Sequence, residues 1–134
     1  MTQEISFQID LKDSYAAAIE KVTAALKEEG FGVLTRIDVD TTLKEKIDVD
    51  FRQYVILGAC NPPLAHRALS AEPKVGLMLP CNVTVEATDG GARVNILNPD
   101  AMLSIEPLNA NAAILEVAAE AKAKLARVAA ALQA

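Results

Sequence analysis

The spacing of apolar residues along the chain changes three times between a strand period and a helix period, and this pattern limits the fold more than any other feature. Residues 51–59 form an apolar, aromatic run, which indicates a strand buried on both faces. Apolar residues three and four apart predict a helix from about residue 14 to Gly30 and a longer one from about residue 109 to the chain end. Alternation of apolar and polar residues predicts four further strands, at 5–11, 31–39, 83–87 and 92–98.

Turn and cap residues separate these segments. Asp13 or Ser14 is suited to cap the first helix, and Gly30 is suited to end it. Asp89-Gly90-Gly91 is a hairpin turn signal between the fourth and fifth strands. Asn109 or Asn111 is suited to cap the last helix.

The predicted order is therefore β-α-β-β-β-β-α. No long crossover helix separates the second to fifth strands, so an antiparallel meander is the simplest topology. The fold class expected is α+β: two layers, with an antiparallel sheet of about five strands and two long helices on one face. At 134 residues the chain is expected to form a single domain, spanning 1–134.

Two connections interrupt this pattern. Segment 40–50 is polar and acidic, and we interpret it as a solvated loop with one helical turn around Leu43 to Lys46. It does not match a calcium-binding loop, because Leu43 occupies the position that requires glycine. Segment 61–79 is longer, and Asn61 followed by Pro62 predicts a short helix there.

Charge and composition exclude several partners. The net charge is −5, and the 13 basic residues are scattered without a basic run. Nucleic-acid binding and docking on an anionic membrane both need clustered lysine and arginine, so neither is expected. No signal peptide or membrane-spanning apolar stretch is visible, which makes the cytoplasm the expected location and reduced thiols the expected state of both cysteines.

A meander brings the end of one strand beside the start of the next. Cys60 follows the third strand and Cys81 opens the fourth, so the two are expected to be neighbours at one end of the sheet. The fifth strand returns to that end and delivers Met102, while the excursion between the cysteines carries His66. The predicted ligand-binding residues are Cys60, Asn61, His66, Cys81 and Met102.

These residue types allow more than one chemistry. A helix N-terminus favours the thiolate form of a nearby cysteine, so Cys60 with His66 is a candidate catalytic pair. Cys60, Cys81 and Met102 are soft ligands that would suit copper(I), whereas no zinc-ligand spacing occurs. Cys81 shares strand parity with Val83 and Val85, which favours a thiol that only packs in the core.

Several motifs resemble the bacterial and archaeal "domain of unknown function 302" family. They are Tyr54 to Pro62 (YVILGACNP), Ala65 to Leu69, and Val75 to Val85 (VGLMLPCNVTV), preceded by Gly30 to Leu34 and Lys44 to Lys46. The resemblance implies a two-layer β-α-β4-α fold similar to one half of the TATA-box-binding protein, and a homodimer. It implies no function, and the family's marked positions correspond to Cys60, Asn61, Pro62, Pro80 and Cys81.

Three functions remain open at this level. The first is a homodimeric module that binds a small ligand, a sulfur species or a soft metal near Cys60 and Cys81. The second is an enzyme or redox protein that uses Cys60 with His66. The third is a structural or partner-binding dimer whose cysteines only pack. No cofactor is identified by the sequence.

Overall fold

A five-stranded antiparallel sheet organises the structure. In the computed structural model, which describes residues 4–134, the strands are β1 (Ser6–Leu11), β2 (Gly32–Asp38), β3 (Tyr54–Cys60), β4 (Cys81–Thr88) and β5 (Gly91–Leu97). Their order across the sheet is β1-β5-β4-β3-β2, so β2 to β5 form the predicted meander and β1 joins beside β5. The expected α+β class with an antiparallel sheet is confirmed.

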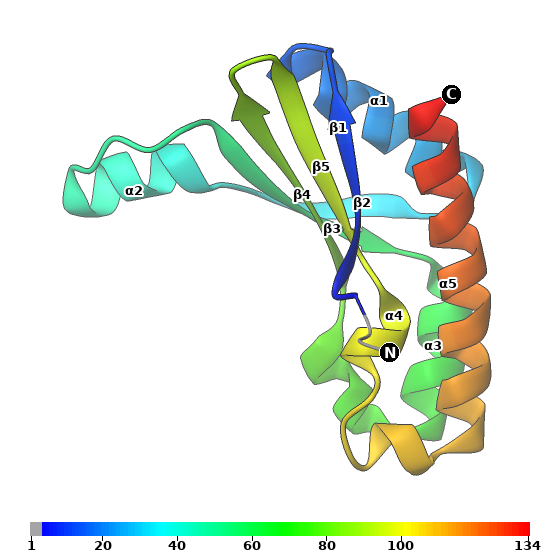
Figure 1. Ribbon diagram of the computed structural model, residues 1–134. Helices are drawn as coiled ribbons and strands as arrows, with labels where there is room; N and C mark the ends of the chain where they lie inside the picture. Colours follow the sequence, from blue (N-terminus) through cyan, green and yellow to red (C-terminus); the bar gives the residue numbers. More distant parts are fainter. Residues whose placement is uncertain (1–3) are drawn as a thin grey trace.

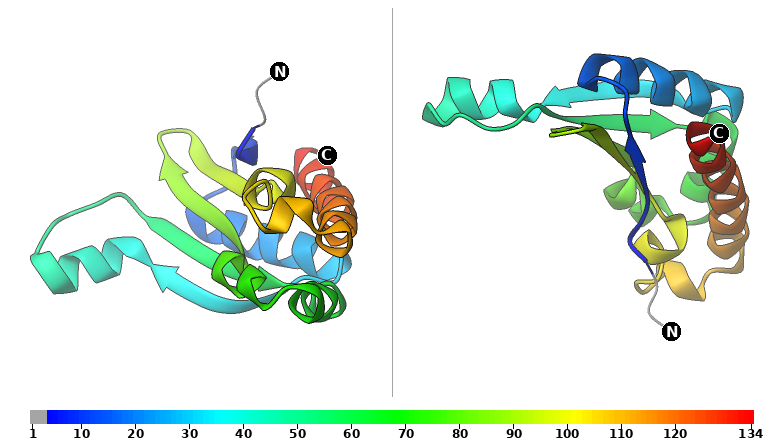
Figure 2. Two further views of the ribbon diagram at one scale, coloured as in Figure 1. Left: turned by 90° about the horizontal axis from the view of Figure 1, so that it is seen from below. Right: turned by 45° about the horizontal axis from the view of Figure 1, so that its top comes forward.

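Two long helices, α1 (Tyr15–Glu28) and α5 (Ala112–Gln133), cover one face of this sheet, as Figure 1 shows. The shorter helix α3 (Pro62–Ala71) lies beside α5. Alternate strand residues are buried beneath the helices, as the two-residue period requires: Val55, Leu57, Val83, Val85, Val94 and Ile96. The residues between them form the opposite face, which none of the helices in the described part of the chain covers (Figure 2).

Asparagine and serine side chains set where the helices begin. The Ser14 hydroxyl accepts a hydrogen bond from the Ala17 amide at 3.2 Å, and Asn111 Oδ1 accepts one from the Ala113 amide at 3.1 Å. Both residues are predicted caps, and each satisfies an amide that the first helical turn leaves free. At the end of α1, Gly30 has φ of 83°, a left-handed conformation that favours glycine.

Three short elements complete the chain. A 3-10 helix, η1 (Pro73–Met78), joins α3 to β4, and the helix α4 (Pro99–Met102) follows β5 directly. A second 3-10 helix, η2 (Leu108–Ala110), precedes α5. None of the helices between residues 4 and 134 combines the length and hydrophobicity of a membrane-spanning segment.

The interpretation of segment 40–50 as a loop is wrong. The chain instead forms a helix, α2 (Val39–Ile47), which projects away from the rest of the molecule in every view (Figures 1 and 2). Val39, Leu43 and Ile47 are four residues apart, a helical spacing that the surrounding charges obscure. The helix ends at Asp48, which has φ of 54°, and Lys44 pairs with the Asp48 carboxylate at 3.0 Å.

The third strand also differs from its prediction. It begins at Tyr54, three residues later than the apolar run, and Phe51 before it is 41% exposed. It was predicted to be buried on both faces, yet Tyr54 and Ile56 are only half-buried. The reason is that the helices cover only one face of the sheet.

A candidate ligand cavity at the end of the sheet

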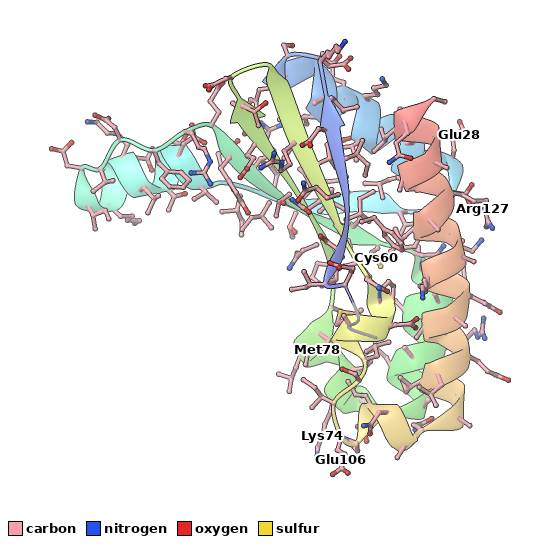
Figure 3. All side chains as sticks on the ribbon, in the orientation of Figure 1. Glu28, Cys60, Lys74, Met78, Glu106 and Arg127 are labelled. Carbon is pink, nitrogen blue, oxygen red and sulfur yellow. The ribbon has the colours of Figure 1, made fainter. Side chains whose placement is uncertain are left out.

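The two cysteines lie at neighbouring positions on adjacent strands. Ala59, the residue before Cys60, is the register partner of Cys81 in the β3–β4 ladder. Cys60 is the last residue of β3 and is half-buried, whereas Cys81 is the first residue of β4 and is buried. Figure 3 labels Cys60 where the lower end of the sheet meets the helices. The predicted convergence of Cys60 and Cys81 is therefore present in the fold.

Both cysteines line a cavity of about 330 Å³. Its walls come from the ends of β3 and β4, from α3 and α5, and from the segments that contain η1 and α4. Met102 also lines it, so the three sulfur-containing residues singled out in the sequence border one space.

Small side chains create this space. Of the seven side chains that α3 and α5 contribute to the cavity wall, four are alanines, beside Leu64, Leu69 and Val117. Each alanine removes about three methyl or methylene groups relative to leucine, and the backbone does not close over the difference. The alanines that line the cavity are Ala59, Ala65, Ala68, Ala118 and Ala121.

Between residues 4 and 134, no charged side chain lines the cavity, and the lining side chains that bear oxygen or nitrogen are those of Thr35 and Asn61. The Asn61 amide is already engaged. Its Oδ1 accepts from the Leu64 amide at 3.3 Å, and its Nδ2 donates to the Glu29 carbonyl at 3.4 Å. We infer that Asn61, a predicted ligand residue, acts chiefly as the cap of α3 and as a link to the end of α1.

Burial controls the charge state of Cys81. Loss of solvent raises the pKa of the Cys81 thiol to about 11, and the nearby Cys60 adds a smaller increase. The thiol of Cys81 is therefore protonated near neutral pH and is a poor nucleophile. Of the two cysteines, the half-buried Cys60 is the one that solvent and reagents reach.

His66 does not join the cysteines, so that part of the predicted convergence is wrong. On α3, Leu64 and Ala68 face the cavity, whereas His66 is exposed and lines a separate shallow groove with Glu116. With 3.6 residues per turn, position 66 lies about 200° around the helix from position 64, and therefore on the opposite side. A cysteine–histidine pair would require a large movement of α3.

A metal site in this cavity would have to use the sulfur-containing residues of its wall. Within residues 4–134, no group of three or more histidine, cysteine, aspartate or glutamate side chains is placed to hold a metal ion. Among the described residues that line the cavity, the candidate soft ligands are Cys60, Cys81 and Met102. The raised pKa of the Cys81 thiol works against its binding as a thiolate.

Sequence reasoning missed the residues at the cavity mouth. Leu34 and Thr35 on β2 line the cavity, and because both residues are exposed we infer that the cavity opens to solvent beside them. A bulge between Val33 and Thr35 shifts the β2–β3 register there. Beside them Gly58 packs so closely on Thr35 and Pro80 that a Cβ atom at position 58 would lie 2.7 Å from Pro80 Cγ. The only signal in the sequence was Gly58 itself, because a glycine inside an apolar strand often marks a place where another part of the chain packs closely against the backbone.

Comparison with known proteins places the chain in a family. The model of the family described as "Domain of unknown function DUF302" matches residues 7–132. The chain belongs to the DUF302 family. Among solved structures, the crystal structure of an uncharacterized conserved DUF302 protein from Bacillus stearothermophilus is similar, with a TM-score of 0.82 and 32% identity. That match covers 98% of both chains, and a search of the curated proteins found no match.

Proposed function

We propose that this DUF302 protein is a homodimeric binding module that holds a small, uncharged, apolar molecule in the cavity beside Cys60 and Cys81. The observation that carries the proposal is the cavity itself, about 330 Å³ in volume, with no charged side chain among the described residues of its wall. An apolar cavity of about 150 Å³ holds benzene, and ligand sites of about 300 Å³ and above are common. The expected ligand is therefore larger than benzene, such as a bicyclic aromatic or a medium-length alkyl chain.

The chemistry of the wall favours this class over an ionic ligand. Moving an unpaired charge into apolar surroundings costs several kcal/mol, and the described residues of the wall provide no opposite charge to offset that cost. An apolar molecule instead gains contacts with side chains that face empty space. The three sulfur-containing residues are polarisable, so an uncharged sulfur compound also fits the proposal.

Two observations weigh against a thiol-dependent enzyme. Cys81 has a raised pKa, and His66 lies on the far side of α3 from Cys60. Cys60 therefore lacks the base that such a mechanism would take from His66. The purely structural alternative leaves the cavity without a role, since a filled core would be more stable than a hollow one.

Filling the cavity tests the proposal. Ala121 on α5 is 7% exposed and lines the cavity, whereas Ala119 on the same helix is exposed. Binding of the uncharged fluorescent probe N-phenyl-1-naphthylamine would be titrated with wild type, Ala121→Leu and Ala119→Leu. We expect Ala121→Leu to weaken binding by at least about tenfold, with a melting temperature that does not fall, because the added methyl groups occupy space that is empty. We expect Ala119→Leu to bind as wild type. Equal binding by all three proteins would contradict the proposal.

A further inference from the structure

The strand β2 forms one edge of the sheet and is largely open. Among the described residues it pairs only with β3, so its outer side is unpaired. Leu34 is 69% exposed and Ile37 is 49% exposed, on a strand of seven residues that contains no proline. A long edge with exposed apolar side chains is a surface on which another strand can pair.

Charges on β2 identify which strand would fit. Arg36 and Asp38 flank Ile37, and within the chain Arg36 Nη2 lies 3.0 Å from Asp38 Oδ1. In an antiparallel pair centred on Ile37, Arg36 lies opposite the partner's Asp38, and Asp38 lies opposite the partner's Arg36. Opposite charges facing each other across a ladder are favourable. The strand is therefore complementary in charge to a second copy of itself.

The helix α2 supplies a second part of this surface. It continues from β2 away from the rest of the chain, and none of its residues is buried (Figure 2). Val39, Leu43 and Ile47 form one apolar stripe along it, and Ile47 is 62% exposed. A nine-residue helix is only marginally stable in water without packing, so we expect the apolar stripe of α2 to pack against a partner.

The register of the β2–β2 pair brings the apolar stripe of α2 against the partner copy. When Ile37 is opposite itself, Val39 of one copy lies level with Thr35 of the other. The helix then advances about 1.5 Å per residue, which brings Leu43 about 6 Å beyond Thr35; because a strand advances about 3.3 Å per residue, this is level with Val33 and beside Leu34. Leu34 borders the cavity mouth and is one of the most exposed apolar residues of the chain.

We propose that two copies of the chain associate through β2, with Ile37 on the two-fold axis, and that the α2 helix of each copy covers the cavity mouth of the other at Leu34. Such an interface is isologous, the commonest kind in homo-oligomers. This inference rests on the homodimer of the proposed function and names its surface. Ligand binding is measured separately, with the fluorescent probe.

Charge exchange tests the register. Wild type is expected to be a dimer of the 14.2 kDa chain by size-exclusion chromatography with light scattering. Arg36→Asp faces the partner's Asp38, so we expect dimer dissociation to become at least about tenfold easier. Combining it with Asp38→Arg restores opposite charges in both pairs and should restore the dimer. Asp10→Arg is the matched control, because it breaks the Asp10–Arg93 ion pair on the far side of the sheet.

A cysteine at the axis gives a second test. With Ile37 opposite itself, the two Cα atoms would be about 4.5–5.5 Å apart, within the range a disulfide spans. Ile37→Cys should form a disulfide-linked dimer when diamide oxidises the two thiols, whereas Thr35→Cys, about 13 Å from its own copy, should not. A monomeric wild type, or a charge exchange that fails to restore the dimer, would overturn the inference. A dimer that Ile37→Cys does not link would show that another surface is used. Probe binding that persists in a monomeric variant would leave the cavity proposal intact.

Discussion

The side chain of Asn61 joins the main chain of Glu29 to the first turn of α3. Its Nδ2 donates to the Glu29 carbonyl at 3.4 Å, while its Oδ1 accepts from the Leu64 amide at 3.3 Å. Asn61 is only 8% exposed, so water cannot readily replace the hydrogen bonds that its Oδ1 and Nδ2 make. One side chain thus fixes the end of α1, the end of β3 and the start of the helix that forms a cavity wall.

Removing this link should destabilise the protein. Asn61→Ala loses the helix cap and leaves the partly buried Glu29 carbonyl without its donor, and we expect a loss of about 1–3 kcal/mol in the free energy of unfolding. Asn61→Ser keeps a cap oxygen but is too short to reach the Glu29 carbonyl, so its loss should be smaller. Urea unfolding measures both. Equal stability of wild type and Asn61→Ala would show that the two hydrogen bonds contribute nothing.

Gly58 should not tolerate a side chain. A Cβ atom there would collide with Thr35 and lie 2.7 Å from Pro80 Cγ, and the proline ring cannot rotate away. We expect Gly58→Ala to lower the free energy of unfolding by about 1–3 kcal/mol. Gly32→Ala is the matched control on the neighbouring strand, because nothing lies within 4 Å of its Cβ position. A Gly58→Ala variant as stable as Gly32→Ala would contradict this packing.

The buried thiol of Cys81 should make stability depend on alkaline pH. Burial raises its pKa from about 9.0 to about 11 in the folded chain. Below pH 9 both states hold the proton, but between these values the unfolded thiol ionises first, so stability falls as pH rises. The loss attributable to Cys81 should reach about 2–3 kcal/mol near pH 11. The measurement is the free energy of unfolding as a function of pH, for wild type and for Cys81→Ala. The other titrating groups are the same in both proteins, so the difference between the two slopes is due to Cys81. Parallel pH profiles would show that Cys81 is not responsible.

Thiol alkylation should separate the two cysteines and test the role of His66. Cys60 is half-buried and Cys81 is buried, so iodoacetamide should modify Cys60 first, with Cys81 following only on denaturation. His66 is exposed on the other side of α3, so His66→Ala should change the Cys60 rate by less than about twofold. Mass spectrometry of the modified peptides gives both rates. A tenfold slower reaction of Cys60 in His66→Ala would instead support the catalytic pair.

Much of the fold was readable from local patterns. The period-two segments, the Asp89-Gly90 turn and the caps Ser14 and Asn111 each depend on neighbouring residues alone, and the meander then follows from short connections. The same logic places Cys60 beside Cys81. Helix α2 was missed because its three apolar residues are diluted by seven charged ones in segment 38–50, so composition indicated a loop.

The cavity could not be predicted in the same way. It depends on Ala65 and Ala68 of α3 facing Ala118 and Ala121 of α5, some fifty positions later in the chain. Sequence spacing gives the face of each helix but not the rotation of one helix relative to the other. For the same reason the side of α3 on which His66 lies was decided only by the packing of Leu64 and Ala68.

The alanine-lined wall has a consequence for how ligand choice could change. Each alanine is carried by an element that other residues hold in place, so a larger side chain at one of these positions shortens the cavity without moving the backbone. Valine, leucine or methionine at Ala65, Ala68, Ala118 or Ala121 would each remove a different part of the space. Each single substitution would reduce the cavity by the volume of a few carbon atoms. The same fold could in this way accept molecules of different length and shape.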